Sequence, residues 1–192
     1  MLSSFTSPWT SRLAGSAPWL ICLDLQREYV VPGRPGYAPA GPDVAAVCLK
    51  VLDHARAAGW RVVHSQLRRH ATSPFGAALF GAPIEGLRPL ISEPVFLRTG
   101  LSAFSDPEFA AELCNAHGAP VHLIGFSLAD TCLATALAAV DHGLSLVLVE
   151  DALGAGQSPA ASAPEIARAI LGRFVGFVSS DEIEAAAMEL AL

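Results

Sequence analysis

The sequence predicts a single α/β domain in which a mostly parallel sheet of six strands is covered by helices on both faces. Short apolar runs recur along the chain, and amphipathic patterns of helical length lie between most of them. The 192 residues with 52% hydrophobic content suit one large core, since domains hold roughly 100 to 200 residues. Alternating strands and helices imply parallel strands that are buried on both faces, which gives a Rossmann-like three-layer sandwich.

The six expected strands are the apolar runs, which span Trp19–Leu25, Arg61–Ser65, Val95–Leu97, Val121–Gly125, Ser145–Glu150 and Phe174–Val178. After the first strand, Asp43 is positioned to cap a helix that Gly59 ends. After the sixth strand, Ser179 and Glu182 form a capping-box pattern that opens a last helix over Glu182–Leu190.

No internal repeat or linker divides the chain, so we expect one domain over residues 1–192, with residues 1–17 as an extended arm. Loops over residues 29–42 and 67–94 are rich in proline and glycine and are long enough to cover a site.

Charge and cysteine content limit the classes of partner. The net charge of -6 without a basic run argues against nucleic acid. No segment has the apolar length of a signal peptide or of a membrane span, so we expect a cytoplasmic protein with no membrane partner. The four cysteines are expected to be reduced. A small molecule is the expected substrate.

Cys132 is the cysteine whose position suggests chemistry. The residues from Val121 to Ala152 are typical of a strand, a tight turn, a helix with Cys132 in its first turn, and another strand. Free N–H groups at a helix start favour a thiolate and stabilise an oxyanion. Three other cysteines lie in apolar settings and are expected to be core fillers: Cys22, Cys48 and Cys114.

Polar side chains end several of the predicted strands. Asp24 ends the first strand, Gln66 and Arg68 follow the second, and Arg98 follows the third. Ligands of open α/β sheets bind beyond the carboxyl ends of the strands, so we expect these groups to converge near Cys132. A carboxylate on an apolar strand costs free energy unless it is paired or functional, and a plain salt bridge is the alternative for Asp24.

Four motifs in this order resemble the isochorismatase-like cysteine hydrolases, a family that includes nicotinamidases and N-carbamoyl amide hydrolases. The resemblance spans nearly the whole chain. The motifs are Asp24-x-Gln26-x-Glu28-Tyr29, Arg98 ahead of Ser102-Ala103-Phe104, Gly125 leading to Cys132 with Thr135-Ala136, and Asp151-Ala152.

The resemblance implies an Asp-Lys-Cys triad, in which Asp24 takes the proton of Cys132 and the thiolate attacks an amide carbonyl. It further implies an oxyanion site at the N–H groups near Leu128 and Cys132, and a cis peptide between Ser127 and Leu128. The expected substrate pocket consists of Gln26, Tyr29, Gln66, Arg68 and Phe104, where core packing is the alternative for both aromatic rings.

Arg98 stands where the family has its catalytic lysine, and the only lysine of the chain is Lys50. Arginine stays charged and grips carboxylates with two hydrogen bonds, but it does not exchange protons near neutrality. Arg98 either clamps Asp24 or points into the cleft to bind a substrate carboxylate. In both cases we expect Arg98 to be essential.

We expect no metal and no cofactor. The metal cluster that nicotinamidases of the family carry after the second strand is missing, and Arg68 and Arg69 would repel a cation. His64 and His70 are expected to be a core histidine and a loop residue. The family commonly forms dimers or larger assemblies, so we expect a homo-oligomer, a dimer or tetramer.

The most consistent function is cysteine-dependent hydrolysis of a small amide or of a ureido or carbamoyl compound. Two alternatives stay open: a non-hydrolytic binding or inactive member of the family, and an isochorismatase-type vinyl ether hydrolase. The Gly125-Phe126-Ser127-Leu128-Ala129 segment approaches the nucleophile elbow of α/β-hydrolases, but no histidine follows Asp151, as that mechanism requires.

Overall fold

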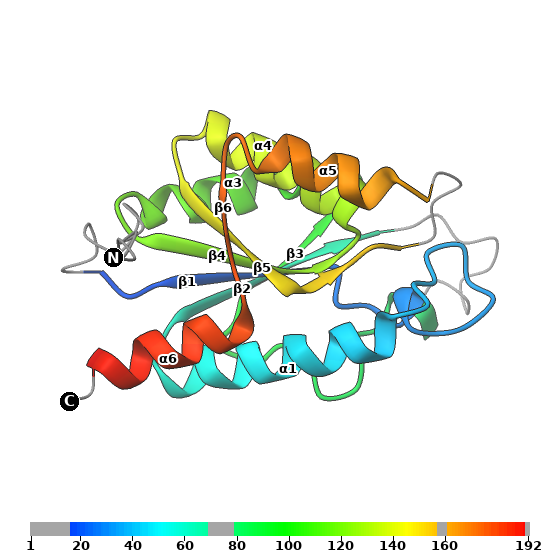
Figure 1. Cartoon of the computed structure of the whole chain (residues 1–192), viewed down its shortest axis with the longest axis horizontal. Helices are drawn as coiled ribbons and strands as arrows, with labels where there is room; N and C mark the ends of the chain where they lie inside the picture. The colour runs from blue at the N-terminus through cyan, green and yellow to red at the C-terminus, as the bar shows by residue number, and fades with distance from the viewer. Residues whose placement is uncertain (1–15, 69–78, 157–160, 191–192) are drawn as a thin grey trace, which may run out of the picture.

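The computed structural model describes residues 16–68, 79–156 and 161–190. Its centre is one sheet of six parallel strands in the spatial order β3-β2-β1-β4-β5-β6 (Figure 1). The strands are β1 (Trp19–Leu23), β2 (Arg61–Leu67), β3 (Val95–Arg98), β4 (Pro120–Phe126), β5 (Ser145–Gly154) and β6 (Gly176–Val178). The predicted α/β fold with a six-stranded sheet is therefore confirmed.

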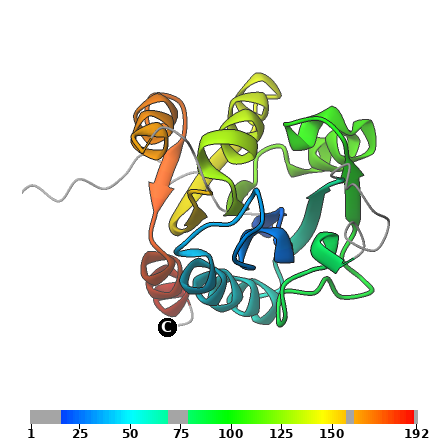
Figure 2. The same ribbon diagram turned by 90° about the vertical axis from the view of Figure 1, so that its right-hand side faces the viewer.

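Helices cover both faces of the sheet (Figures 1 and 2). One face carries α1 (Gly41–Ala57) and α6 (Ser180–Leu190), and the other carries α3 (Pro107–Leu113), α4 (Leu133–Asp141) and α5 (Ala163–Leu171). Side chains alternate along β1, so Ile21 and Leu23 join the apolar cluster under α3, α4 and α5, while Leu20 and Cys22 join the cluster under α1. Each face of the sheet therefore has its own buried core.

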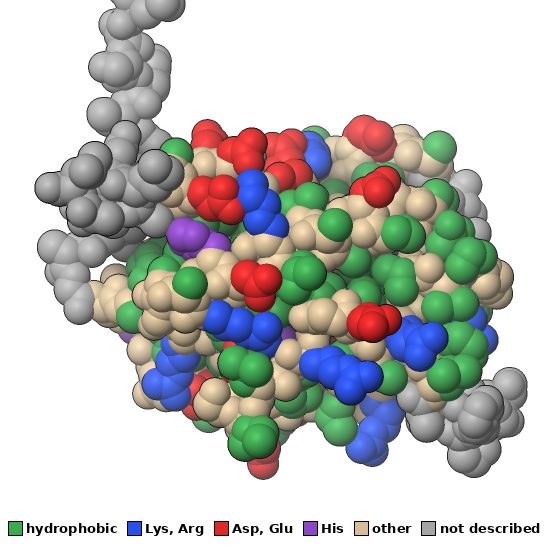
Figure 3. All heavy atoms as spheres, turned by 90° about the horizontal axis from the view of Figure 1, so that it is seen from below, with side chains coloured by type: hydrophobic (Ala, Val, Ile, Leu, Met, Phe, Trp, Pro, Cys, Tyr) green, Lys and Arg blue, Asp and Glu red, His purple; other side chains and the backbone are tan. Residues whose placement is uncertain are grey.

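The outer surface of the α1 and α6 layer carries charges of both signs (Figure 3). Acidic side chains gather over α6, where Asp181 and Glu184 form ion pairs with Lys50 of α1 at 2.7 and 3.2 Å. These contacts tie the last helix to the first. Among the helices that the structure describes, none has the length and apolar character needed to cross a membrane.

The order of the strands reverses at β1. The chain builds β1, β2 and β3 toward one edge and then returns to place β4 on the other side of β1. Leu23 at the end of β1 pairs with Ser65 of β2 and with Gly125 of β4. Open sheets of this kind bind their ligands beyond the carboxyl ends of the strands at this reversal. The topology therefore points to the ends of β1, β2 and β4.

Gly125 allows β4 to approach β1 closely at this point. Its φ is +128°, and a Cβ built on it would lie 1.8 Å from the carbonyl oxygen of Leu23. An L side chain has no room there, because backbone would have to move. The close approach brings the turn after β4 next to the end of β1.

The helix boundaries confirm two predicted signals and correct one. Gly59 has a φ of +70° and follows α1 as expected. Ser179 and Glu182 form the predicted capping box, with N–H to carboxylate and N–H to hydroxyl distances of 2.6 and 3.2 Å. Asp43 is not the cap that we predicted: α1 begins at Gly41, because Pro42 suits the first turn, and Asp43 lies inside that turn.

Several strands begin or end at other residues than the apolar runs predicted. β1 ends at Leu23, two residues early, while β5 extends to Gly154 and so includes Asp151 and Ala152. β6 begins at Gly176 rather than Phe174. Hydrogen bonding to neighbouring strands decides these ends, and the apolar pattern alone does not show it.

Candidate active site

Asp24 lies directly beyond β1 and is fully buried. Its φ is +52°, the one left-handed value of a non-glycine residue in the described part of the chain. Aspartate tolerates this conformation better than most L residues do. The turn ends β1, while the Asp24 N–H still donates to the carbonyl of Ser65 at 2.9 Å. The carboxylate is thereby placed at the reversal of strand order.

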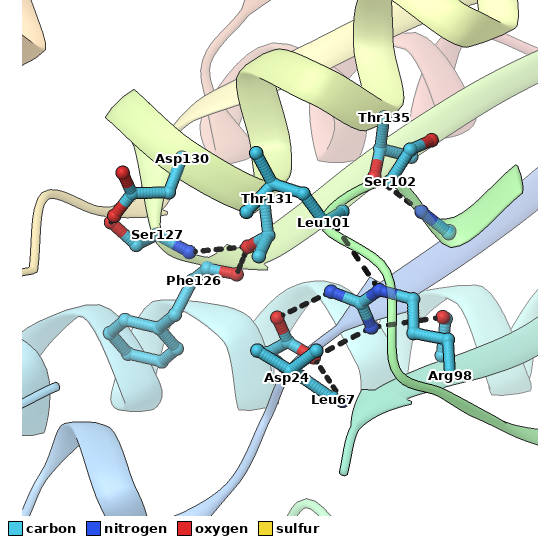
Figure 4. Close-up of polar contacts among 12 residues, drawn as sticks. Asp24, Leu67, Arg98, Leu101, Ser102, Phe126, Ser127, Asp130, Thr131 and Thr135 are labelled. Carbon is cyan, nitrogen blue, oxygen red and sulfur yellow. Dashed lines mark hydrogen bonds and ion pairs between the residues drawn. The ribbon is translucent and has the colours of Figure 1, made fainter. Parts of the chain in front are cut away.

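Arg98 at the end of β3 clamps this carboxylate with two parallel hydrogen bonds (Figure 4). The distances are 2.8 Å from Nη1 to Oδ1 and 2.7 Å from Nη2 to Oδ2, and both side chains have no exposed surface. Nη1 also donates to the Ser65 hydroxyl at 3.1 Å, and Nε donates to the Leu101 carbonyl at 3.4 Å. This bidentate geometry is the strong form of an arginine–carboxylate contact.

Of the two orientations expected for Arg98, the structure has the clamp. Four of its five N–H groups donate to acceptors in the described residues. The other expectation, that Arg98 points into the cleft toward a substrate carboxylate, is wrong for this conformation. The Arg98 charge is paired with that of Asp24, because a buried carboxylate needs a partner.

The turn after β4 consists of Ser127, followed by a π-helical turn, η5 (Leu128–Cys132), that continues into α4. The peptide between Phe126 and Ser127 is cis. The predicted cis bond between Ser127 and Leu128 is therefore wrong by one residue, since β4 runs through Phe126. The Thr131 hydroxyl braces this turn: it accepts from Ser127 N at 2.9 Å and donates to Phe126 O at 2.6 Å (Figure 4).

Cys132 ends the π-helical turn and is fully buried. Burial raises the pKa of its thiol well above the ordinary value; the charge of Asp24 raises this pKa further, and the charge of Arg98 lowers it. Cys132 is therefore a thiol at neutral pH, and the expectation that the helix start favours a thiolate is corrected. Desolvation outweighs the helix terminus, because Cys132 lies five residues into the helical segment.

Of the two N–H groups expected to bind an oxyanion, that of Cys132 is engaged in another hydrogen bond. The Cys132 N–H donates to the Ser127 carbonyl at 3.0 Å, so in this conformation it is engaged within the turn. Leu128 is the first residue of the helical segment, where N–H groups have no partner inside the helix. The Ser127 hydroxyl donates to the Ala155 carbonyl at 2.9 Å, which holds the turn against the end of β5.

Two of the expected pocket residues are held firmly at this end of the sheet. The Gln26 amide donates to the carbonyls of Leu67 and Gly81 at 3.3 and 3.0 Å. Tyr29 is buried and stacks on Phe126, with 5.0 Å between ring centroids. Both side chains therefore link the end of β1 to the neighbouring loops and to β4.

The other three expected pocket residues come from β2 and from the segments that follow β2 and β3. Gln66 is half-buried and alternates to the opposite face of β2 from Ser65, while Arg68 is exposed and donates its N–H to Arg98 O at 2.7 Å. Phe104 does not line the site: its ring packs on Phe109 and on His142, at the far end of α4 from Cys132. The core reading of Phe104 is the correct one.

Three polar groups of the site were missed from the sequence. Ser65 accepts from Arg98, the Leu67 N–H donates to Asp24 Oδ1 at 2.7 Å, and Thr131 braces the turn. Ser65 could have been found, because a serine at the end of a predicted buried strand needs a hydrogen-bond partner. A backbone donor such as that of Leu67 carries no signal in the sequence.

The remaining cysteines and histidines agree only partly with expectation. Cys22 and Cys48 are buried, and burial raises the pKa of both thiols, but Cys114 is exposed and is no core filler. His64 is the expected core histidine; however, it has a carboxylate partner, Glu93, at 2.9 Å from Nε2. His70 and Arg69 lie outside the described residues, and no group of three metal-binding side chains occurs within them.

Comparison with known proteins identifies the family. The protein-family model of the isochorismatase domain matches residues 18–175 of the sequence. The chain belongs to the isochorismatase family. Maleamate amidohydrolase from Pseudomonas putida KT2440 is 27% identical over 169 residues, which cover 79% of each chain. The resemblance inferred from the four motifs is confirmed.

Solved structures share this fold. An isochorismatase-like hydrolase from Alkaliphilus metalliredigens matches with a TM-score of 0.76 and 18% identity, over 89% of this chain and 99% of that one. N-carbamoylsarcosine amidase from Thermoplasma acidophilum matches with a TM-score of 0.68 and 20% identity, over 86% and 98%. This chain is thus an isochorismatase-family hydrolase that is similar in sequence to a maleamate amidohydrolase and shares its fold with an N-carbamoylsarcosine amidase.

Proposed function

We propose that this chain hydrolyses the carbon–nitrogen bond of a small amide or of a ureido or carbamoyl compound, with Cys132 as nucleophile, Asp24 as base and Arg98 in place of lysine. The observation that supports it best is the buried Asp24–Arg98 pair, whose charges both act on the Cys132 thiol. The amidohydrolase relatives support the same reaction class. A buried ion pair whose charges act on a cysteine thiol at a strand-order reversal is a cluster of titratable side chains of the kind found in active sites.

The first step needs a base, because burial keeps Cys132 protonated. Asp24 Oδ1 already accepts two hydrogen bonds, from Arg98 and Leu67, whereas Oδ2 accepts one among the described residues. Oδ2 therefore has an acceptor position for the thiol proton. Once the proton has moved, Sγ attacks the substrate carbonyl carbon, and the carbonyl oxygen takes the electron pair as an oxyanion near the Leu128 N–H.

Collapse of this intermediate breaks the carbon–nitrogen bond. The leaving nitrogen takes the proton from Asp24 and departs as ammonia or an amine, which leaves a thioester on Cys132. Water then attacks the thioester and gives a proton to Asp24; the acid leaves, and the proton returns to Cys132. Arg98 keeps its charge throughout and holds the Asp24 carboxylate in place. Gln26 and Tyr29 are the expected pocket residues nearest to Asp24 along the chain.

The alternative, a protein of this family that binds but does not hydrolyse, is favoured by one observation. The clamp takes both carboxylate oxygens of Asp24, and arginine cannot pass the proton onward as lysine does. Under this alternative the wild-type protein has no turnover.

Ammonia release from a panel of small amides, ureido acids and carbamoyl amino acids tests the proposal. We expect activity in the wild type and in Cys114→Ala, which removes the exposed thiol, and none in Cys132→Ala or Asp24→Asn. Activity that persists in Cys132→Ala would refute cysteine catalysis. Silence of the wild type with activity in Arg98→Lys would establish the binding alternative. Residence in the cytoplasm remains a prediction.

A further inference from the structure

The loop that follows η2 (Arg27–Tyr29) lies beyond the carboxyl ends of the strands, at the end of the sheet where Asp24 lies (Figures 1 and 2). Arg34 belongs to this loop, and 31% of its side chain is exposed. Glu28 of η2 is buried; it accepts hydrogen bonds from Arg34 Nε at 2.9 Å and from the Gly36 N–H at 3.1 Å. Glu28 therefore holds both the loop and the Arg34 side chain in place.

The Phe80 ring fixes the plane of the Arg34 guanidinium. The guanidinium carbon lies 3.9 Å from the centroid of this ring, which is a cation–π contact. Nε is bound to Glu28, whereas Nη1 and Nη2 have no hydrogen bond among the residues that the structure describes. Arg34 therefore keeps four of its five N–H groups for a ligand, in a plane that Phe80 and Glu28 hold.

Phe80 also connects this guanidinium to the end of β1. Phe80 is followed directly by Gly81, whose carbonyl accepts a hydrogen bond from the Gln26 amide at 3.0 Å. Gln26 is an expected pocket residue and stands two positions after Asp24. Two contacts, Arg34 to Phe80 and Gln26 to Gly81, therefore join Arg34 to the segment that carries Asp24.

The short helix η2 links Arg34 to the turn that carries Cys132. Glu28 of η2 binds Arg34, and its neighbour Tyr29 stacks on Phe126 with 5.0 Å between ring centroids. Phe126 is the last residue of β4, and the turn to Cys132 follows it. Arg34 and the segment before Cys132 therefore contact adjacent residues of the same helix.

Two further arginines add positive charge at this end of the sheet. Arg27 begins η2, and Arg68 directly follows β2. Both are exposed, and neither side chain has an ion-pair partner in the part of the chain that the structure describes. The Glu28 carboxylate offsets the charge of Arg34, but the fork of a guanidinium has more than one edge for carboxylates. An anionic group of a ligand is therefore favoured at the free edge of Arg34.

We propose that Arg34 is a specificity-determining residue that binds a carboxylate of the substrate, so that the site prefers amides that carry a free carboxylate over neutral amides. This inference rests on the proposed function, because it names the substrate class of the same site. Nη1 and Nη2 donate two parallel hydrogen bonds to the carboxylate, while the amide carbonyl lies at Cys132. Arg98 does not bind this carboxylate, because Asp24 already takes its guanidinium. The distance between Arg34 and Cys132 then selects the length of the substrate.

Isothermal titration calorimetry of Cys132→Ala measures this preference without turnover. The probes are malonamate, succinamate and glutaramate, three half-amides of increasing length, each compared with the corresponding neutral diamide. We expect at least one half-amide to bind ~10- to 100-fold more tightly than its diamide, as hydrogen bonds to a charged group predict. Addition of Arg34→Gln should bring the two affinities to within about 3-fold of each other. Arg88→Gln, which removes an exposed charge elsewhere in the loop after Phe80, is the matched control and keeps the preference.

Steady-state kinetics separate substrate binding from a structural role of Arg34. In the otherwise wild-type protein, Arg34→Gln should raise the KM for the preferred half-amide at least ~10-fold, with kcat and the kinetics of the diamide changed less than about 3-fold. A structural role would lower kcat for both compounds. Phe80→Leu keeps the charge but removes the ring face, so it should lose part of the preference; melting temperatures report that both variants fold.

The outcomes distinguish this inference from the proposed function. Half-amides that bind no more tightly than diamides, half-amides that do not bind at all, or a preference that survives Arg34→Gln would each overturn the role of Arg34, even in a protein that releases ammonia. A wild type that binds half-amides selectively through Arg34 but releases no ammonia would refute hydrolysis and leave the carboxylate site established.

Discussion

Replacement of Arg98 by methionine tests whether the clamp supports both stability and the site. The substitution keeps a long apolar side chain but removes the hydrogen bonds of 2.8 and 2.7 Å to Asp24 and that of 3.1 Å to Ser65. Asp24 would keep the Leu67 N–H as its partner and would remain fully buried. Removal of one partner of a buried ion pair costs about 3–5 kcal/mol, because the other charge is left uncompensated.

Urea unfolding at pH 7, followed by circular dichroism, measures this cost. We expect Arg98→Met to lower the free energy of unfolding by about 3–5 kcal/mol. Arg98→Lys should lie between this variant and the wild type, since an ammonium restores the charge but cannot form both parallel hydrogen bonds. Ammonia release should disappear in Arg98→Met.

A double-mutant cycle with Asp24→Asn isolates the pair from general packing effects. In the double variant both partners are neutral, so its destabilisation should be smaller than the sum of the single ones by at least about 2 kcal/mol. An Arg98→Met variant within about 1 kcal/mol of the wild type, or single effects that simply add, would show that the Asp24–Arg98 pair does not stabilise the fold.

Burial of His122 and Cys132 and the close backbone approach at Gly125 lead to three further predictions. Burial lowers the pKa of His122 to about 4, whereas a histidine of the unfolded chain has a pKa of about 6.5. Between pH 6.5 and pH 4 the unfolded chain therefore binds a proton that the folded chain does not bind. The free energy of unfolding falls as pH falls through this window, by up to ~3 kcal/mol. Urea unfolding at pH 7 and 4.5 should show a smaller loss in His122→Leu; an equal loss would contradict this. Gly125→Ala should cost more than ~3 kcal/mol, against ~1 kcal/mol for Gly118→Ala, whose Cβ meets nothing within 4 Å; similar losses would contradict the close approach. Iodoacetamide at pH 7 should label exposed Cys114 before buried Cys132 in mass spectra, and the reverse order would show an activated thiol.

Much of the site could be located from the sequence. Asp24 and Cys132 follow strands of a parallel sheet, Arg98 ends another, and the carboxyl ends of parallel strands meet at one edge. The apolar runs also predicted all six strands and the helical layers. These inferences succeed because burial on both faces of a sheet leaves a continuous apolar pattern in the chain.

Local geometry could not be predicted from the same patterns. Asp43 has the residue type of a cap, yet Pro42 starts the helix earlier, and the cis bond lies before Ser127 rather than after it. Phe104 fits a pocket wall by motif but packs on Phe109 and His142 instead. Each depends on competition between neighbours for hydrogen bonds or space, which spacing along the chain does not record.

The sequence by itself determined the fold class, the family and which residue types gather at the ends of the strands, since these depend on hydrophobic periodicity and on motif order. Only the tertiary structure decided what those residues do to one another. Arg98 could have faced a substrate or Asp24. The structure has the pair with Asp24, because a buried carboxylate without a partner would strongly destabilise the fold. Likewise Cys132 remains a thiol, since its surroundings exclude water more strongly than the helix terminus favours the anion.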